Sequence, residues 1–283
     1  PETGLKRTRS SSGHTGLGEI KSLETPKSHA LGCESCSHTQ ARHMFDGEKA
    51  SLEAILSTDT IRVPRPVKVV IWKAGGPCSS WSTYSTQLGQ QLADLHLHNK
   101  RRQKEKRNKE EQTVGKGTGQ SEVPVIDKFG FHVNTCCGYI SQVNDWQDDW
   151  VSFYVQQRLQ YQLGLLEQSY GDREARELWA SLQLKIPQLF AGVEVDPALL
   201  HDGPVIFDPA SFYGHAEFEL GITGMFGGFG KHFYNAYHEK IPKAPGFDKR
   251  HQLYQLFHYL NHWNHFGPGY RGSSLRIMKE LSK

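Results

Sequence analysis

The sequence predicts an α+β protein whose second half is mainly helical. Residues 61–72, IRVPRPVKVVIW, alternate apolar and polar positions and contain two prolines, a pattern typical of a strand at the edge of a sheet. From residue 86 onward apolar residues recur at helical spacing, as at Leu88, Leu92 and Leu95. We therefore expect a small part that contains a sheet, followed by a larger helical part.

Length and charge limit the possible classes of protein. The chain has 283 residues, enough to bury a sizeable core in one two-lobed domain or two small ones. A formal net charge of +3 gives no indication of nucleic-acid binding. No apolar run approaches the roughly twenty residues of a membrane-spanning helix, and no secretory signal opens the chain. We expect a cytosolic monomer with neither a nucleic-acid nor a membrane partner.

The cysteines indicate a reducing compartment. Five cysteines form an odd set without a secretory signal, so we expect free thiols. Cys33 and Cys36 form a C-x-x-C motif, but no second pair with zinc-ligand spacing follows. A zinc knuckle at this pair therefore remains the weaker alternative. We interpret the adjacent Cys136 and Cys137 as buried, inert thiols in a strand.

The first part of the chain contains two regions that differ in composition and periodicity. Residues 1–40 are rich in Ser, Thr, Gly, Lys and Pro without a period of 2 or 3.6, so we expect them to be disordered or poorly packed. An amphipathic helix follows in residues 41–56.

Several segments of the second half have simple structural interpretations. The run KRRQKEKRNKEEQTVGKGTGQSE (100–122) mixes basic with acidic residues and lacks aromatic ones, which favours a solvated helix end and loop over a nucleic-acid-binding arm. The acidic residues Asp145, Asp148 and Asp149 suit the start of a helix, where the helix dipole favours negative charge. Buried helix faces are predicted at Trp150, Phe153, Tyr154 and Leu159, and at Leu253, Leu256, Phe257 and Leu260.

Asp208 is the acidic residue with the clearest metal-ligand context. The apolar run Val205, Ile206 and Phe207 leads to Asp208 at the end of an expected buried strand, and Pro209 stops further pairing. A carboxylate fixed at a strand end can bind Mg²⁺, which prefers oxygen ligands and usually retains substrate phosphates in its shell. Capping of a turn before Pro209 is the alternative.

Four long segments carry a resemblance to a known family. They are FGFHVNTCCGYISQVNDWQDDW (129–150), GDREARELWASLQLKIPQLF (171–190), VIFDPASFYGHAEFEL (205–220) and KIPKAPGFDKRHQLYQLFHYLNHWNHFG (240–267). They closely resemble the fructosamine-3-kinase and ketosamine-3-kinase family, also called protein-ribulosamine 3-kinases, and lie nearer to the ketosamine-3-kinase type. The family is a branch of the aminoglycoside-phosphotransferase and protein-kinase-like fold. The resemblance implies a single two-lobed domain, with an incomplete small lobe in residues 41–84 and a mainly helical large lobe in residues 85–283.

The same resemblance implies a role for Asp208 and shows which parts are missing. Asp208 to Ala210 stand where protein kinases carry D-F-G, which makes Asp208 the expected Mg²⁺ ligand. The family reads A-L-L-H-G-D-L-W-x-G-N-V before the strand that leads to this ligand, whereas here His201 is followed directly by Asp202 and Gly203. The missing loop would supply the catalytic Asp and a metal-binding Asn. Asp202 is a weak substitute base, since it aligns better with the acidic end of the family loop.

Nucleotide binding also lacks expected parts. Glu48 matches the small-lobe Glu that pairs with a strand Lys, but no such strand or Gly-rich phosphate loop is found in residues 1–40. We therefore expect Glu48 to be a solvated surface carboxylate. The segment KAGGPCSSWSTYS (73–85) offers no apolar strand for the hinge that holds adenine in the family.

The candidate substrate-binding residues are His215, Trp263 and His265. Trp263 and His265 belong to the polar-aromatic cluster His262 to His265, and an indole can stack on the face of a sugar. A satisfied core histidine and a packed tryptophan are the alternatives.

The resemblance implies ATP-dependent phosphorylation of the 3-hydroxyl of protein-bound ketosamines, such as ribulosamines, followed by deglycation. ATP and Mg²⁺ are the implied cofactors, and glycated proteins or small ketosamines are the implied substrates. Because the catalytic loop is missing, a second hypothesis stays open. The chain is then a non-catalytic pseudokinase, or the product of defective splicing or a faulty gene model, and acts at most as a binding module.

Overall fold

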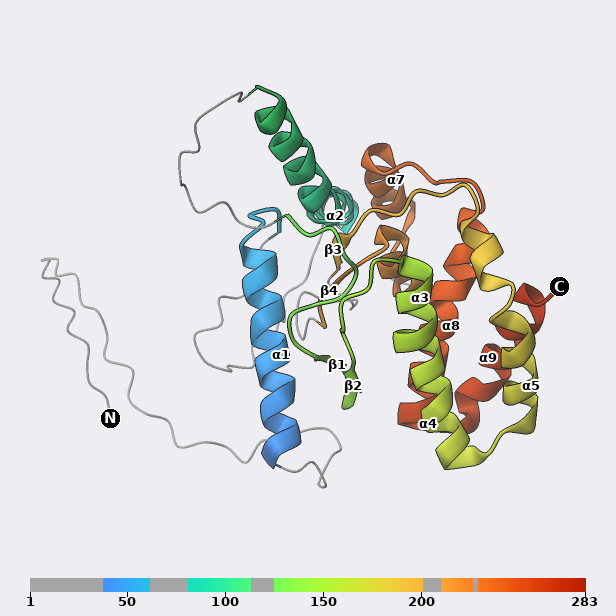
Figure 1. The fold of residues 1–283 in the computed structure, drawn as a ribbon. Coiled ribbons are helices and arrows are strands. Elements are labelled where there is room, and N and C mark those ends of the chain that lie inside the picture. The colour runs from blue at the N-terminus through green and yellow to red at the C-terminus, as the bar shows by residue number, and fades with distance from the viewer. Residues whose placement is uncertain (1–37, 62–80, 113–124, 201–209, 226–228) are drawn as a thin grey trace, which may run out of the picture. The chain divides into compact units, whose positions relative to one another are not determined.

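The computed structural model describes residues 38–61, 81–112, 125–200, 210–225 and 229–283 (Figure 1). All of them belong to one unit, Ser37–Lys283. The predictions for residues 1–37 and for the strand in residues 62–72 lie outside the described residues.

Helices account for most of the described chain (Figure 1). In chain order they are α1 (His38–Leu56), α2 (Trp81–Gln112), α3 (Trp150–Tyr154), α4 (Tyr161–Tyr170), α5 (Arg173–Leu182), α6 (Glu219–Thr223), α7 (Lys231–Lys240), α8 (Phe247–Phe266) and α9 (Arg271–Leu281). A π-helical segment, Val155–Gln160, joins α3 to α4, and single 3-10 turns occur at Ile186–Phe190, Ala216–Phe218 and Pro268–Tyr270. No helix of this part of the chain is long and apolar enough to cross a membrane.

The strands of the described residues form two separate antiparallel pairs. Strand β1 (Thr135–Cys137) pairs with β2 (Ile140–Gln142), and β3 (Ala198–Leu200) pairs with β4 (Phe212–Gly214). Cys136 and Cys137 lie in a strand as predicted, but both are half-buried rather than fully buried. The prevalence of helices over strands in the described residues fits the mainly helical large lobe that the resemblance implies.

Helix α1 begins at His38, slightly before the predicted start at residue 41. Its apolar face buries Leu52 and Ile55, and its contact with the β1–β2 hairpin is close at Gly47. A Cβ atom at Gly47 would lie 2.7 Å from the carbonyl oxygen of Asn134. Any larger residue at position 47 would therefore push the helix away from the hairpin.

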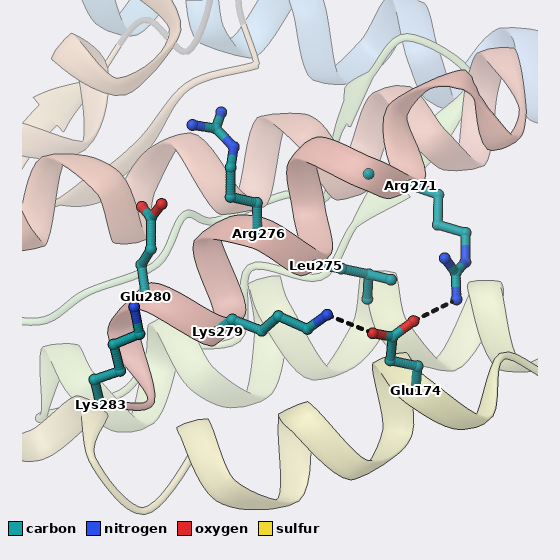
Figure 2. Close-up of a pocket in the computed structure, with 8 residues that line it drawn as sticks. Glu174, Arg271, Leu275, Arg276, Lys279, Glu280 and Lys283 are labelled. Atoms are coloured by element: carbon teal, nitrogen blue, oxygen red, sulfur yellow. Dashed lines mark hydrogen bonds and ion pairs between the residues drawn. The ribbon is translucent and has the colours of Figure 1, made fainter.

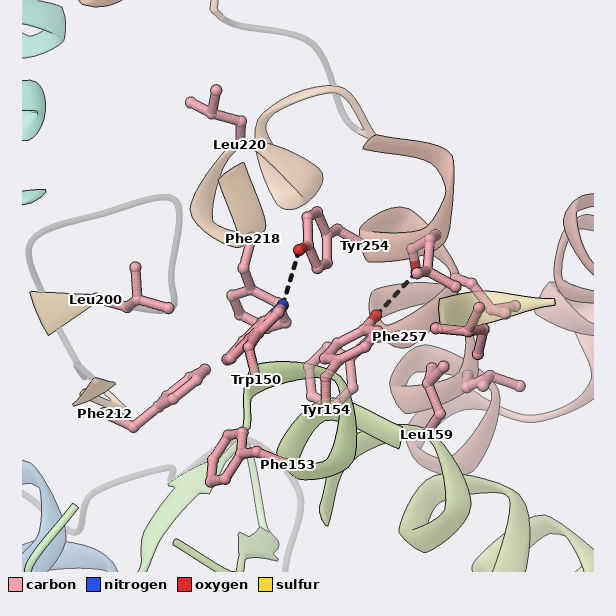
Figure 3. Packing of buried hydrophobic residues seen from close by; sticks show 14 of the residues in the cluster. Trp150, Phe153, Tyr154, Leu159, Leu200, Phe212, Phe218, Leu220, Tyr254 and Phe257 are labelled. Carbon is pink, nitrogen blue, oxygen red and sulfur yellow. Dashed lines mark hydrogen bonds between the residues drawn. The ribbon is translucent and has the colours of Figure 1, made fainter. Parts of the chain in front are cut away.

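The core of the helical part contains the predicted stripes. Trp150, Phe153, Tyr154 and Leu159 are at most 2 % exposed. They pack against Leu253, Leu256, Phe257 and Leu260 of α8, none of which is more than 1 % exposed (Figure 3). The aromatic ring of Trp150 stacks on those of Phe153 and Tyr154 because residues three and four apart share a helix face. Periodicity alone predicted these residues correctly.

Helix boundaries also follow local rules. Asp149 is the N-cap of α3, and its carboxylate accepts a hydrogen bond from the Ser152 amide at 2.7 Å. Asp172 caps α5 in the same way through the Ala175 amide at 2.9 Å. The predicted place of Asp149 at a helix start is confirmed. The charged residues of the 100–112 run lie on the exposed end of α2, as expected.

Candidate functional site

The candidate site is built around the antiparallel pair of β3 and β4. Leu200 pairs with Phe212, and Ala198 pairs with Gly214, so the chain leaves β3 and enters β4 at the same edge. Residues 201–209 connect the two strands there and contain Asp202 and Asp208. Both aspartates lie outside the described residues. The described part therefore fixes where this acidic connection starts and ends.

Helix α1 contacts the chain directly after this connection. The amide of Ser211 donates a hydrogen bond of 3.0 Å to the Ser51 hydroxyl, which in turn donates to the Gly47 carbonyl at 2.8 Å. Both serines are fully buried. An amide without a partner in such a place would cost about 1–3 kcal/mol. The bond therefore joins α1 to the residue that precedes β4.

Glu48 lies on the same helix, within one turn of Ser51. It is half-buried and takes part in an interaction with another group. Glu48 is therefore not the isolated, fully solvated carboxylate that the sequence predicted.

A metal site is not assembled by the described residues. No three His, Cys, Asp or Glu side chains of the described part gather closely enough to hold an ion. The hydroxyl of Ser211 is buried beside the 201–209 connection and has no hydrogen-bond partner. A single hydroxyl without a hydrogen-bond partner does not make a set of metal ligands. The role of Asp208 as a Mg²⁺ ligand stays a prediction.

The structure places His215 in the core. Its Nδ1 lies 2.7 Å from the hydroxyl of Tyr254, which accepts a hydrogen bond of 3.0 Å from the indole N–H of Trp150. Burial lowers the pKa of His215 to about 3, with a smaller contribution from the Arg250 charge. The imidazole is therefore neutral at pH 7, and its Nδ1 can accept a hydrogen bond from the Tyr254 hydroxyl. This arrangement gives His215 a packing role.

Trp263 and His265 occupy different environments. Trp263 is 1 % exposed, and its ring centroid lies 5.9 Å from that of Tyr170. His265 is half-buried, and its Nε2 accepts a hydrogen bond of 3.2 Å from the Tyr139 amide. Its Nδ1 lies 2.8 Å from the Asn261 carbonyl, so the neutral tautomer with the proton on Nδ1 satisfies both contacts. Burial also lowers the pKa of His265.

His265 thus holds the turn of the β1–β2 hairpin against α8. Gly138 occupies this turn with a φ of +64°, and a Cβ atom there would lie 2.3 Å from Nε2 of His265. Tyr139 completes the contact by donating a hydrogen bond of 2.9 Å to the Asn264 carbonyl. Binding of a sugar by His215, Trp263 or His265 stays a prediction beside these structural roles.

Two buried charged residues were missed by the sequence analysis. Arg158 is 1 % exposed and donates to the Asn144 side chain at 2.6 Å and to the Val143 carbonyl at 2.8 Å. Its guanidinium also lies 4.2 Å from the ring centroid of Phe212 in β4, a cation–π contact. An arginine one turn after Tyr154, on an apolar helix face, was the available signal.

Arg250 is the second buried residue that the sequence analysis missed, and its ion pair with Glu217 joins α8 to the chain after β4. Arg250 donates to both carboxylate oxygens of Glu217 at 2.8 Å, and Arg250 is fully buried. Arg250 also donates to the carbonyl of Pro245 at 2.6 Å. The 3-10 turn after β4 is therefore fixed to α8 by a bidentate ion pair.

A surface hollow of about 450 Å³ lies between α5 and α9 (Figure 2). Glu174 of α5 crosses it and pairs with Arg271 at 2.8 Å and with Lys279 at 2.6 Å. No residue of α1, β3 or β4 lines this hollow. The hollow is therefore not part of the candidate site.

The fold places this protein in the protein-kinase-like class of folds. The structure aligns with that of a protein from Thermobifida fusca described as a fructosamine-3-kinase, with a TM-score of 0.65, 23 % identity and coverage of 84 % of this chain and 80 % of that one. A similarly described protein from Haemophilus somnus aligns with a TM-score of 0.63 at 21 % identity, over 85 % of this chain and 80 % of that one. At these identities the alignments show the fold alone.

The sequence comparisons identify the family. Residues 34–283 match the family model described as fructosamine kinase, and the chain belongs to this family of kinases. It is 56 % identical to ketosamine-3-kinase from Mus musculus, over all of both chains. It is also 36 % identical to the chloroplastic protein-ribulosamine 3-kinase of Arabidopsis thaliana, over 84 % of this chain and 72 % of the relative. The resemblance stated from the sequence is confirmed.

The alignment with the mouse relative also bears on the missing parts. It spans 310 residues, more than the 283 of this chain, although it covers the whole of both proteins. The relative therefore has residues that this chain lacks. The alignment length alone does not assign them to a particular loop.

Proposed function

We propose that the protein phosphorylates the 3-hydroxyl of ketosamines at the expense of ATP, with ribulosamines on lysine side chains as the substrate class. The observation that carries this proposal is the 56 % identity to a ketosamine-3-kinase along the entire chain. Fructosamines and psicosamines are further members of the same substrate class. Phosphorylation would labilise the sugar adduct and so return a glycated protein to its unmodified form.

The proposed roles follow the β3–β4 edge. Asp208 is the candidate Mg²⁺ ligand, and the ion would neutralise charge on the transferred phosphate. Asp202 is the weak candidate for the base, and Glu48 is the candidate small-lobe residue near the nucleotide. A cytosolic location and a monomeric state belong to the same proposal.

A second function of a different class is favoured by one observation. His201 is followed directly by Asp202, where the family pattern carries the catalytic loop. A chain without this loop would act as a ligand-binding module, because positioning and charge stabilisation supply most of the rate in phosphoryl transfer. Loss of one well-placed electrostatic contact typically costs about a hundred- to a thousand-fold in turnover.

The experiment compares the 283-residue chain with a version that carries the H-G-D-L-W-x-G-N loop, the Gly-rich loop and the strand Lys. Both are mixed with MgATP and ribulosyl-lysine, and phosphorylated sugar is quantified. We expect slower turnover by orders of magnitude in the present chain. Equal turnover would refute the importance of the missing parts. A residual rate abolished in Asp202→Asn but kept in Glu48→Gln would identify Asp202 as the base.

A further inference from the structure

Trp146 is an exposed aromatic side chain on a firmly held backbone. It is 39 % exposed, although large apolar side chains are usually buried. On one side of it Gln147 exchanges two hydrogen bonds of 2.8 Å with Phe129, and on the other the Asn144 carbonyl accepts from Phe131 at 2.9 Å. The backbone at Trp146 is thus fixed before any ligand arrives, which lowers the entropic cost of binding.

Close packing against Gly130 also fixes the indole of Trp146. Gly130 has a φ of +140°, and a Cβ atom there would lie 3.1 Å from the Cα and 3.2 Å from Cε3 of Trp146. The absence of a side chain at Gly130 therefore lets the two segments touch. The Trp146 ring rests at a centroid distance of 6.2 Å from the ring of Tyr213.

Tyr213 places this aromatic pair beside the candidate site. It is the central residue of β4, and it exchanges hydrogen bonds of 3.0 and 2.8 Å with the backbone of Gly130. The chain enters β4 directly from the connection that contains Asp208. A ligand group on Trp146 would therefore lie near the edge at which we propose that phosphoryl transfer takes place.

Most charged residues of the two segments that meet at Trp146 are acidic, in contrast to the chain as a whole. Asp127, Asp145, Asp148 and Asp149 are exposed in the two segments that meet here, and Lys128 is the one basic residue of residues 127–130 and 144–149. Lys128 is paired with Asp148 at 3.0 Å. Arg102 of α2 adds one positive charge that acts on the Tyr213 hydroxyl. The excess of carboxylates on the two segments still favours a cation over the triphosphate of a nucleotide.

A ketosamine carries a cation close to its reacting hydroxyl. Its nitrogen is a secondary amine that is protonated at neutral pH, and only a few bonds separate it from the 3-hydroxyl. Tryptophan offers the best aromatic face for an ammonium group, within about 6 Å of the ring centroid. We propose that Trp146, supported by Tyr213, binds the protonated amine of the ketosamine by a cation–π contact. This inference rests on the proposed function and assigns the recognition of the amine.

The test uses the full chain and two probes. The first probe is Nα-acetyl-Nε-ribulosyl-lysine, and the second is its Nε-acetylated form, which has no charge on that nitrogen. Binding is measured by calorimetry for the unmodified protein and for Trp146→Ala, Trp146→Phe and Tyr170→Ala. Tyr170 is the matched control, because it is 45 % exposed and tilts by 35° against Trp263, as Trp146 tilts by 33° against Tyr213.

We expect Trp146→Ala to weaken binding of the charged probe about 5- to 30-fold and Trp146→Phe to retain most of the affinity. Tyr170→Ala should bind like the unmodified protein, and Trp146→Ala should not alter binding of the uncharged probe. Equal affinity of Trp146→Ala and the unmodified protein for the charged probe would overturn the inference alone. An equal loss for both probes would also overturn it, because the contact would then not depend on charge. Failure of the unmodified protein to bind the charged probe would overturn the proposed substrate class as well.

Discussion

Replacement of Arg250 by methionine tests the energetic role of the buried ion pair after β4. In the folded protein Arg250 is fully buried and Glu217 is 7 % exposed. The guanidinium donates two hydrogen bonds of 2.8 Å to the carboxylate. Methionine fills most of the space but leaves the carboxylate of Glu217 buried without its counter-charge. Breaking one side of such a pair typically costs about 3–5 kcal/mol of unfolding free energy.

The expected loss is large enough to measure in two ways. In urea the midpoint should fall with an unchanged slope, since the surface exposed on unfolding hardly changes. A loss of this size should lower the melting temperature by about 6–20 °C in a protein of this length. Replacing both residues, as Arg250→Met with Glu217→Leu, should restore most of the stability, because a buried ion pair contributes little over an apolar pair of similar size.

Arg271→Met is the matched control. Arg271 also donates two hydrogen bonds to a carboxylate, that of Asp172, at 2.6 and 3.3 Å, but it is 38 % exposed. Water can replace these contacts, so the control should lose little stability. The reasoning would be refuted if Arg250→Met and Arg271→Met unfolded at the same urea concentration, or if the double variant were no more stable than Arg250→Met.

Two further predictions follow from buried polar groups. Ser51→Ala should lose about 1–3 kcal/mol of unfolding free energy and speed hydrogen exchange at the Ser211 amide, because it removes the acceptor of that amide. The control Ser274→Ala removes only a hydrogen bond of 3.0 Å to the Tyr270 carbonyl and should leave the Ser211 amide protected. Equal exchange at this amide in both variants would contradict the role of the Ser51 hydroxyl. Burial lowers the pKa of His258 and of His215 to about 3 in the folded protein. As the pH drops below 6.5, these histidines take up protons in the unfolded chain while they stay neutral in the folded one. The free energy of unfolding should therefore fall between pH 6.5 and pH 3. His258→Gln should reduce this slope in urea titrations by up to about 1.4 kcal/mol per pH unit, and an unchanged slope would show that His258 is not buried in its neutral form.

The sequence predicted which residues enter the core because burial follows helical periodicity. Trp150, Phe153 and Tyr154 recur on one face of a helix and are buried in the structure. The N-cap role of Asp149 was predictable for the same local reason, since its partner is the amide of Ser152. The family was recognisable from long matching segments, and the family model confirms it over residues 34–283.

Periodicity does not predict which distant groups meet. Ser51 and Ser211 are separated by 160 positions, and their hydrogen bond depends on how α1 packs beside β4. The contact between Trp146 and Gly130 was likewise not predictable, because the two residues belong to separate segments that only the fold brings together.

The roles of histidines and tryptophans required the tertiary structure for the same reason. His215 and Trp263 have side chains that suit either a binding site or a core, and the sequence left both alternatives open. Their burial depends on packing against segments that lie far from them along the chain, which include Tyr254 beside His215 and Tyr170 beside Trp263. The sequence by itself identified the family and predicted the buried helix faces. The tertiary structure decided which polar groups are paired in the core and which aromatic side chain remains exposed beside β4, because both depend on contacts between segments that local sequence does not encode.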